Sequence, residues 1–588
     1  MPALKLTGFS GETPRIVPRL LPPTAAQVAI DARLDDGSLA PYLAPALVTT
    51  LEGGPFNTIF RYGATWLGFS GTVNLAPGPV ADDRLYYTGD GVPKLRVGDD
   101  VYPLAVPRPQ TAPTATPSGG GTGDVQTRVY VYTFVTGFGE ESEPSPASNE
   151  IDWQSGQTVT LSGIENAPVS PARNITKQRF YRSQSGTVGT DLYFIAERDV
   201  SAANFVDTVP VDQFAEPLPS RHWNAPPDDL AGLIALPNGM MAAFAGKRLY
   251  FCEPYRPHAW PEIYVLTADV AIVALAAVGT TVWVLTEGVP YRVMGSAPDA
   301  MVMEKVEANL PCINTRAVVD LGHAVAWPTN EGLAVARSDG AVGLASKNLF
   351  APRDWLRLNP QIMRAGQIEG RWIGSYTAAN EAGQDISGSL IIDLYGESFL
   401  IRSSIKARAW FYELSSSELF FLDDLNAIRQ FDHPSSQPLP LSWRSKEFVL
   451  PKPENLGVIL IETGAGVSED AAEDRQAEID AIVDERAAAI ADEDNDLVGG
   501  SVGGHVLAGA ALAGDLLPLV PPPLTVEVAV QVYADHQLVA SISTLNRVAR
   551  LPSGFTARLW EIAVASNAQI EQITIAKTAD ELKQVPSQ

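Results

Sequence analysis

The chain has 588 residues, of which 68 are Asp or Glu and 42 are Lys or Arg, so its formal net charge is -26. This length suggests about four domains, or fewer if some are large β units, and it excludes a single small module. The acidic balance argues against a surface that wraps nucleic acid through Lys and Arg.

The composition is that of a globular chain: 45% of the residues are hydrophobic and 19% are charged. Two cysteines, Cys252 and Cys312, are too few for a disulfide framework or a Cys-x-x-Cys metal knuckle, so we expect a reducing compartment and no redox chemistry. The N-terminal residues lack the apolar core and cleavage site of a signal peptide. The apolar run at 270–286 contains Gly279 and β-branched residues, which predicts two strands and a turn instead of a membrane span.

A degenerate hairpin unit recurs along the chain, in which an apolar strand meets a turn glycine and then a second strand with an aromatic or β-branched residue. It is found at 60–69, 243–252, 276–285, 327–336, 366–375 and, without glycine, at 414–423. The spacing of these units scatters around the roughly 40 to 50 residues of a four-stranded propeller blade. We therefore predict a mainly β fold with a degenerate β-propeller of about six blades. Residues 1–106 would hold an N-terminal segment and the first blade, and residues 223–438 the others. An irregular β-sandwich is the alternative, because no WD or Kelch signature is present.

Residues 107–222 have a different character and are predicted to be an inserted domain. They begin with a Pro-, Thr- and Gly-rich stretch at 107–121 that is typical of a linker. Alternating strands follow at 128–136, 157–161, 178–182 and 192–196, a pattern that favours a fibronectin-III-like or immunoglobulin-like sandwich. Residues 137–147 are similar to the acidic, Pro-rich loop that follows an early strand in fibronectin-III-like domains.

Residues 439–588 are predicted to form a C-terminal β domain, with strands at 441–450, 457–462, 524–533 and 558–564. An insertion at 464–523 interrupts them. Its first part, 468–491, predicts the one long helix, with a thin apolar stripe of Ile479, Ile482, Val483 and Ile490. Residues 467–497 hold 12 acidic and 2 basic side chains. A Gly- and Ala-rich tract at 499–514 follows and predicts a mobile loop.

The sequence contains no convincing catalytic motif. Neither Gly8-Phe-Ser-Gly11 nor Gly68-Phe-Ser-Gly71 completes a nucleophile elbow, and Gly119–Gly123 lacks the third glycine of a dinucleotide loop. The acidic run at 492–496 lacks the glycine and glutamate of a calcium loop. The six histidines, none paired as in HxH or HExxH, are His222, His258, His323, His433, His505 and His536. We therefore expect no enzyme, no catalytic or cofactor-binding residues, no cofactor and no metal ligands, although a metal site assembled across strands stays open.

Several segments resemble the tail nozzle proteins, or tail tubular protein B, of short-tailed bacteriophages. They are residues 8–22 (GFSGETPRIVPRLLP), 26–41 (AQVAIDARLDDGSLAP), 248–261 (RLYFCEPYRPHAWP), 285–296 (LTEGVPYRVMGS) and 441–451 (LSWRSKEFVLP). The resemblance thus reaches both ends and the middle of the chain. The insert at 107–222 and the insertion at 464–523 have no counterpart in these motifs and look like lineage-specific additions.

This resemblance implies a virion structural protein of the tail, assembled in the host cytoplasm as a ring that is usually a homohexamer. The ring would lie below the portal and adaptor, would contact tail fibres or spikes and so reach the host envelope indirectly, and would pass duplex DNA without sequence-specific binding. An acidic wall suits that role, because Lys and Arg would trap phosphates. The insertion at 464–523 is then a candidate gate or plug. The alternatives are a propeller-type glycan-binding or glycan-degrading tail protein and a neck or hub protein of a longer tail.

Overall fold

The computed structural model describes residues 3–583 except for 171, 187, 188, 211, 212, 214, 380, 381, 395–398, 465–468 and 492–525. The chain forms two compact units. Unit 1 is Met1–Gly53, Asn330–Leu333 and Leu344–Gln588, and unit 2 is Gly54–Thr329 and Ala334–Gly343. Much of the insertion predicted at 464–523, including His505, the acidic run at 492–496, the glycine-rich tract and therefore most of the candidate gate, lies outside the described residues.

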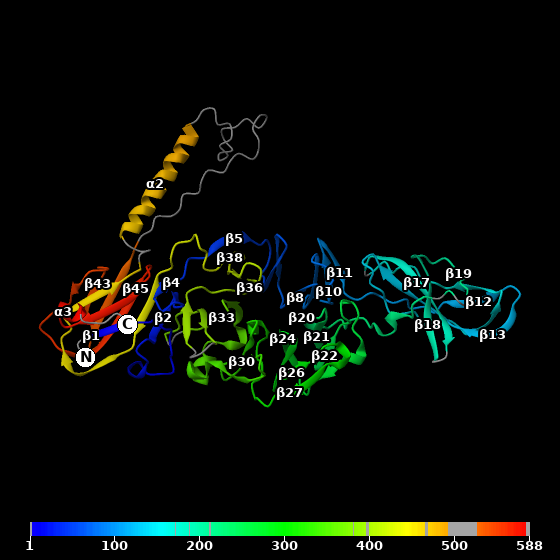
Figure 1. The fold of residues 1–588 in the computed structure, drawn as a ribbon, viewed down its shortest axis with the longest axis horizontal. Helices are drawn as coiled ribbons and strands as arrows, with labels where there is room; N and C mark the ends of the chain where they lie inside the picture. The colour runs from blue at the N-terminus through cyan, green and yellow to red at the C-terminus, as the bar shows by residue number, and fades with distance from the viewer. Residues whose placement is uncertain are drawn as a thin grey trace. The chain divides into compact units, whose positions relative to one another are not determined.

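The fold is mainly β, as the sequence predicts. Strands hold 47% of the residues and helices 9%, and the described strands form many small antiparallel sheets with no closed barrel. The long helix predicted at 468–491 is confirmed as α2 (Glu469–Ala491), whereas α1 (Pro352–Leu356) and α3 (Ala579–Lys583) are single turns (Figure 1). None of the helices in the described part of the chain combines the length and hydropathy needed to span a bilayer.

The recurring hairpin units at 60–69, 243–252, 276–285 and 366–375 are hairpins with two-residue turns, whereas four residues connect the strands of the units at 327–336 and 414–423. Gly246 joins β21 (Met241–Ala245) to β22 (Arg248–Phe251), and Gly279 joins β24 (Ile272–Val278) to β25 (Thr281–Thr286). Both glycines have a positive φ, 58° and 60°, which these tight turns require and which strains any residue with a Cβ. The apolar run at 270–286 is therefore two strands and a turn, as predicted.

Four four-stranded antiparallel sheets follow one another between residues 74 and 344. Besides β21, β22, β24 and β25, their strands are β8 (Asn74–Pro77), β9 (Arg84–Thr88), β10 (Lys94–Val97), β11 (Asp100–Pro103), β20 (Ala231–Ala235), β23 (Leu266–Thr267), β26 (Tyr291–Met294), β27 (Val302–Lys305), β28 (Val319–Asp320), β29 (Ala324–Pro328), β30 (Leu333–Arg337) and β31 (Val342–Leu344). Each sheet shares an apolar core with the next one: Tyr86 and Met241 belong to one core cluster, Leu249 and Val282 to a second, and Trp283 and Trp327 to a third. A separate hairpin, β6 (Thr58–Tyr62) and β7 (Thr65–Phe69), precedes them.

The insert contributes eight strands to unit 2, and these fold around their own core of Tyr130, Tyr132, Phe134, Trp153 and Phe180. They pair as three sheets made of β12 (Thr114–Ser118), β16 (Thr158–Ser162) and β19 (Phe205–Asp207); β13 (Thr122–Arg128) and β15 (Ile151–Ser155); and β14 (Tyr130–Thr136), β17 (Ile175–Gly186) and β18 (Gly189–Asp199). The linker prediction for 107–121 is wrong for its second part, which is the edge strand β12. Pro117 is tolerated there because β12 pairs with β16 alone.

The acidic, Pro-rich loop of the insert covers the free edge of β14. Ser142, Ser145 and Ser148 each donate a backbone N–H to a carbonyl of β14, and each hydroxyl accepts the N–H of the same strand residue. The serines recur every third residue, the repeat of a polyproline II helix, while their partners recur every second residue. This pairing satisfies N–H and C=O groups along the edge of β14 that could otherwise pair with another strand.

Unit 1 joins both ends of the chain in shared sheets. A ten-stranded sheet has the order β32-β33-β34-β35-β2-β39-β45-β42-β43, and β40 also pairs with β45. These strands are β32 (Arg364–Ile368), β33 (Arg371–Tyr376), β34 (Gly388–Ile392), β35 (Leu400–Ser403), β2 (Ala26–Ile30), β39 (Leu441–Ser445), β45 (Ala557–Ser566), β42 (Val528–Ala534), β43 (Gln537–Ile542) and β40 (Phe448–Glu454). The strands predicted at 441–450, 524–533 and 558–564 correspond to β39 and β40, β42 and β45 of this sheet, whereas the one predicted at 457–462 lies in another sheet.

Two further four-stranded sheets of unit 1 each contain an N-terminal strand. β5 (Ala46–Thr50) completes a sheet with β36 (Ala409–Glu413), β37 (Glu418–Leu422) and β38 (Ala427–Gln430). β1 (Ala3–Thr7) pairs with β46 (Gln572–Ala576), which also pairs with β41 (Val458–Glu462), itself next to β44 (Ala549–Arg550) (Figure 1). The first 50 residues are therefore held by strands that follow more than 350 residues later.

Candidate functional site

The opening motif of the chain is a structural clasp of unit 1. A Cβ on Gly11 would lie 2.4 Å from the carbonyl oxygen of Leu400, so only glycine fits there. Next to it, the buried Glu12 accepts the N–H of Ala29 at 2.9 Å and lies 2.9 Å from Nε of Arg402. Burial raises the pKa of Glu12 against the opposing effect of Arg402. These residues hold separate chain segments of unit 1 together.

A group of ionisable side chains, most of them buried, lies at the base of the insert in unit 2. We call it the junction cluster: Glu140, Glu141, Arg173, Arg179 and His258. The carboxylate of Glu140 lies 2.7 Å from Nη2 of Arg173, and their side chains are exposed by only 7% and 0%. Removing either partner of such a buried pair leaves an uncompensated charge in the interior and destabilises the fold.

Glu141, the neighbour of Glu140, is held by the insert itself. Its carboxylate accepts the hydroxyls of Thr133 and Tyr181 at 2.8 and 2.6 Å and lies 2.9 Å from Nη1 of Arg179. Burial, reinforced by the Glu141 charge, raises the pKa of Tyr181 well above its usual value. The phenol therefore stays a hydrogen-bond donor at neutral pH.

His258 links the junction cluster to the loop after β22. Its Nε2 lies 3.2 Å from the carbonyl oxygen of Glu141, and its Nδ1 lies 4.0 Å from Oε1 of Glu140, too far for a hydrogen bond. Burial lowers the pKa of His258 to about 4, although Glu140 acts in the opposite direction. The imidazole is consequently neutral at pH 7, and the cluster fastens the insert to that loop.

A second buried carboxylate, Glu561 of β45, lies in unit 1. Its Oε2 accepts Nε and Nη2 of Arg444 at 2.9 and 2.7 Å and Nε2 of Gln27 at 3.1 Å. The register of β2 against β39 shifts at Gln27, a bulge that directs this amide toward Glu561. The side chain of Glu561 is 1% exposed, and its second oxygen, Oε1, faces His536.

His536 belongs to the two-residue turn between β42 and β43. Its Nδ1 lies 3.1 Å from Oε1 of Glu561, while its ring is 64% exposed. Glu447, between β39 and β40, completes a group of three whose potential ligand atoms all lie within 4.8 Å of one another. We call Gln27, Arg444, Glu447, His536 and Glu561 the Glu561 cluster. Sequence spacing could not reveal this cluster, because its three potential metal ligands come from three separate elements.

The structure separates the remaining candidates of the sequence. His222 is exposed, His323 places Nδ1 3.0 Å from the carbonyl oxygen of Leu321, and His433 accepts the N–H of Ser435 at 3.3 Å. Cys252 and Cys312 are both buried free thiols, and burial raises the pKa of each to about 12. Neither thiol is available as a thiolate at neutral pH.

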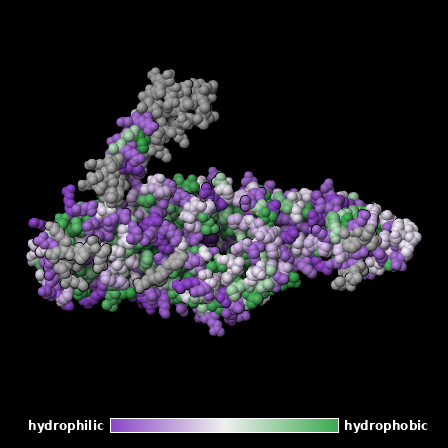
Figure 2. Space-filling model, viewed as in Figure 1, coloured by the Kyte–Doolittle hydropathy of each residue, from purple (hydrophilic) through white to green (hydrophobic). Residues whose placement is uncertain are grey.

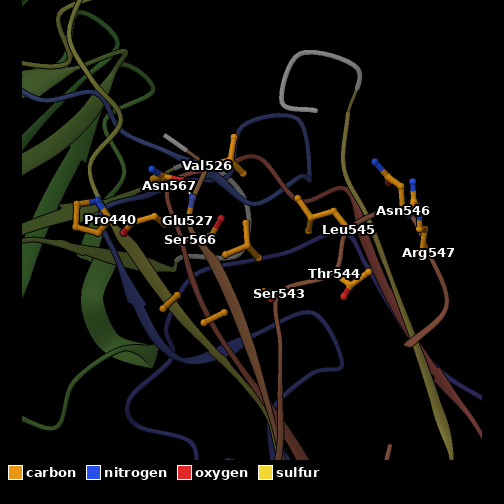
Figure 3. A pocket seen from close by; sticks show the side chains of 13 residues that line it. Pro440, Val526, Glu527, Ser543, Thr544, Leu545, Asn546, Arg547, Ser566 and Asn567 are labelled. Carbon is orange, nitrogen blue, oxygen red and sulfur yellow. Dashed lines mark hydrogen bonds between the residues drawn. The ribbon is translucent and has the colours of Figure 1, made fainter. Parts of the chain in front are cut away.

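A groove of unit 1, with a volume of about 790 Å³, lies beside the start of β42. Figure 3 shows Pro440, Glu527 and Ser566 on one side of it and Asn546 and Arg547 on the other. Two smaller cavities of unit 1, of about 660 and 310 Å³, contain Phe350 and Phe399. Trp and Tyr line none of these three cavities, and the aromatic rings in them are those of the two phenylalanines.

Known proteins provide little comparison. No protein-family model matches the sequence, and no curated protein matches it. Among solved structures, apo AztD from Citrobacter koseri is 8% identical, with a TM-score of 0.25, and the match covers 58% of this chain and 88% of AztD. The AfRom2 CNH domain is 11% identical, with a TM-score of 0.22, over 51% of this chain and 90% of that domain.

Proposed function

We propose that this chain is a virion structural protein, the tail nozzle subunit of a short-tailed bacteriophage, which forms a ring-shaped conduit for DNA ejection. The observation that carries the proposal is the convergence of the resembling motifs. Residues 26–41 and 441–451 contribute β2 and β39, which pair with Val28 opposite Arg444. The indole N–H of Trp443 donates to the carbonyl oxygen of Ser10, and the ring centroids of Trp443 and Phe9 are 5.0 Å apart. Motifs from the two ends of the chain therefore build one structural element.

The fold that we propose for the wall is a degenerate propeller of about six blades. Four consecutive four-stranded sheets with shared cores, the quartet β32–β35 and the sheet closed by β5 supply six such sets of strands. An N-terminal strand, β5, completes the last set by pairing with β38. The insert, with two faces of strands around one aromatic core, fits a fibronectin-III-like sandwich.

The partners follow from this role. The net charge of -26 suits a channel in which duplex DNA slides without being held. DNA is held when Lys and Arg side chains neutralise phosphates and release their counterions, and acidic side chains outnumber Lys and Arg in this chain. We propose a homohexamer in the virion tail, in contact with adaptor or portal-proximal rings and with tail fibres or spikes. On the face drawn in Figure 2, apolar residues form small scattered groups among hydrophilic ones.

The alternatives are a glycan-binding or glycan-degrading propeller protein of the tail and a neck or hub protein of a longer tail. The first requires a pocket with Trp or Tyr beside a carboxylate, and the three cavities described above in unit 1 contain neither ring. The second shares the ring and the acidic surface, so the neighbouring proteins in the particle distinguish it.

Electron cryomicroscopy of the untagged, purified full-length chain tests the proposal. We expect a closed ring with an axial channel wide enough for duplex DNA, and no retention of DNA fragments at low salt, where phosphate contacts are strongest. A monomer or dimer that binds host glycans would overturn the conduit and favour the alternative. A ring that binds DNA tightly with a steep salt dependence would contradict the acidic wall.

A further inference from the structure

The Glu561 cluster has the composition and spacing of a metal site. Glu447, His536 and Glu561 offer two carboxylates and an imidazole from the β39–β40 connection, the β42–β43 turn and β45. The 3.1 Å between Nδ1 of His536 and Oε1 of Glu561 is the separation of two ligands each ~2.1 Å from one ion at an angle of about 95°. Glu447 has a partly exposed side chain, and its potential ligand atom lies within 4.8 Å of those of the other two residues.

An independent observation at the site is the strained turn that presents the imidazole. Asp535 and His536 have φ values of 42° and 66°, left-handed conformations that two-residue turns normally give to Asn and Gly. Asp535 is held there because its carboxylate accepts the N–H groups of Arg558 and Leu559, and its own N–H donates to Leu559. His536 occupies the turn position that is normally glycine, and its hydrogen bond described above is made by the side chain, to Glu561. Strain of this kind often marks a functional residue.

The arginine and the amide beside Glu561 occupy one of its oxygens, and the other, Oε1, faces only His536 among the contacts described above. Arg444 and Gln27 occupy Oε2 and orient the carboxylate, as outer partners of metal ligands commonly do. Lys446, the nearest lysine in sequence, donates instead to the carbonyl oxygen of Leu21. The ion would therefore meet Oε1 of Glu561, His536 and Glu447, while Arg444 stays on the far oxygen.

We propose that Glu447, His536 and Glu561 bind a divalent transition-metal ion, Zn²⁺ in the first instance. An imidazole together with carboxylates suits Zn²⁺, whereas Mg²⁺ and Ca²⁺ prefer oxygen ligands alone. The ion fastens the tip of the β42–β43 hairpin to β45 and to the β39–β40 connection. This site is independent of the proposed conduit function, and it holds for any assembly that unit 1 enters.

Zinc titration of the untagged, chelator-treated full-length chain tests the site. We expect isothermal calorimetry to show one equivalent of Zn²⁺ bound, and the melting temperature to rise with Zn²⁺ but not with Mg²⁺. Glu447→Gln and His536→Ala should each weaken binding by at least about tenfold. Both variants leave the Arg444–Glu561 pair intact, so they should fold.

His222→Ala is the matched control, because it removes an exposed histidine of unit 2 and should leave zinc affinity unchanged. Zinc binding that persists in both ligand variants, or that falls equally in His222→Ala, would overturn the proposal. So would the absence of saturable binding to the wild-type chain, which would leave His536 and Glu561 as an ordinary ion pair. Stabilisation by Ca²⁺ in place of Zn²⁺ would contradict the transition-metal assignment.

Discussion

At the base of the insert, Glu140 and its partner Arg173 are exposed by 7% and 0%, whereas Arg444 and His536, the partners of the equally buried Glu561, are exposed by 38% and 64%. Both regions bury a carboxylate beside arginine, but the Glu140–Arg173 pair is closed to water, whereas the partners of Glu561 are open to it. A closed ion pair can serve packing alone, because no ligand reaches it. In an open one, the carboxylate and its exposed partner can both be reached by an ion, which is why we assign fastening to the junction cluster and binding to the Glu561 cluster.

The largest effect should come from breaking the closed pair. Glu140→Gln leaves the guanidinium of Arg173 buried without a counter-charge, which we expect to destabilise unit 2 by about 3 to 5 kcal/mol. Scanning calorimetry of the full chain, with hydrogen exchange of β14 as the local readout, measures this loss. Glu150→Gln, an exposed change in the same loop, is the control. A loss similar to that of the control would show that Glu140 and Arg173 are not coupled.

The pH dependence of the junction cluster should come next. His258 has a pKa of about 4 in the folded protein and 6.5 as an unperturbed group, so between these values the unfolded chain binds a proton that the folded chain does not. Stability should therefore be unaffected by this group above pH 6.5 and should fall as the pH drops from 6.5 to 4, by about 3 kcal/mol in total. His258→Gln, which cannot titrate, should show a shallower fall over this window. Parallel melting curves for the two proteins would contradict this assignment.

The Glu561 cluster should lose less stability than the junction cluster when its buried glutamate is changed to glutamine. Glu561→Gln removes the charge that holds Arg444 and His536, but both side chains can turn to water, so we expect a loss of about 2 kcal/mol. Calorimetry of the unit 1 transition, compared with the exposed change Glu571→Gln, measures it. A loss as large as that of Glu140→Gln would mean that water access does not separate the two clusters.

The smallest effect concerns the turn that presents His536. Without metal, His536→Gly should be more stable than His536→Ala by about 1 kcal/mol, because glycine adopts the left-handed φ of 66° without strain. Both variants lack the imidazole, so their difference isolates the backbone contribution, measured as the difference in melting temperature in the presence of a chelator. Equal stabilities would show that the turn is relaxed and would weaken the argument from strain.

Local patterns predicted much of the fold. The hairpins around Gly246 and Gly279, the strands of the insert and the helix α2 follow from apolar alternation, turn glycines and helix periodicity, which act over a few residues. The same local logic misjudged 114–118, where Pro117 and two threonines suggested a linker. Only pairing with β16 makes that segment a strand.

By itself, the sequence determined that the protein is acidic, mainly β, poor in cysteine and without a contiguous catalytic motif, because composition and short-range spacing are written in the chain. Tertiary structure alone decided that β5 completes a sheet with β38, that Glu12 reaches Arg402, and that His536 meets Glu561 beside Glu447. These contacts join residues between 25 and almost 400 positions apart. No local propensity encodes them, since they form only when distant strands close their sheets.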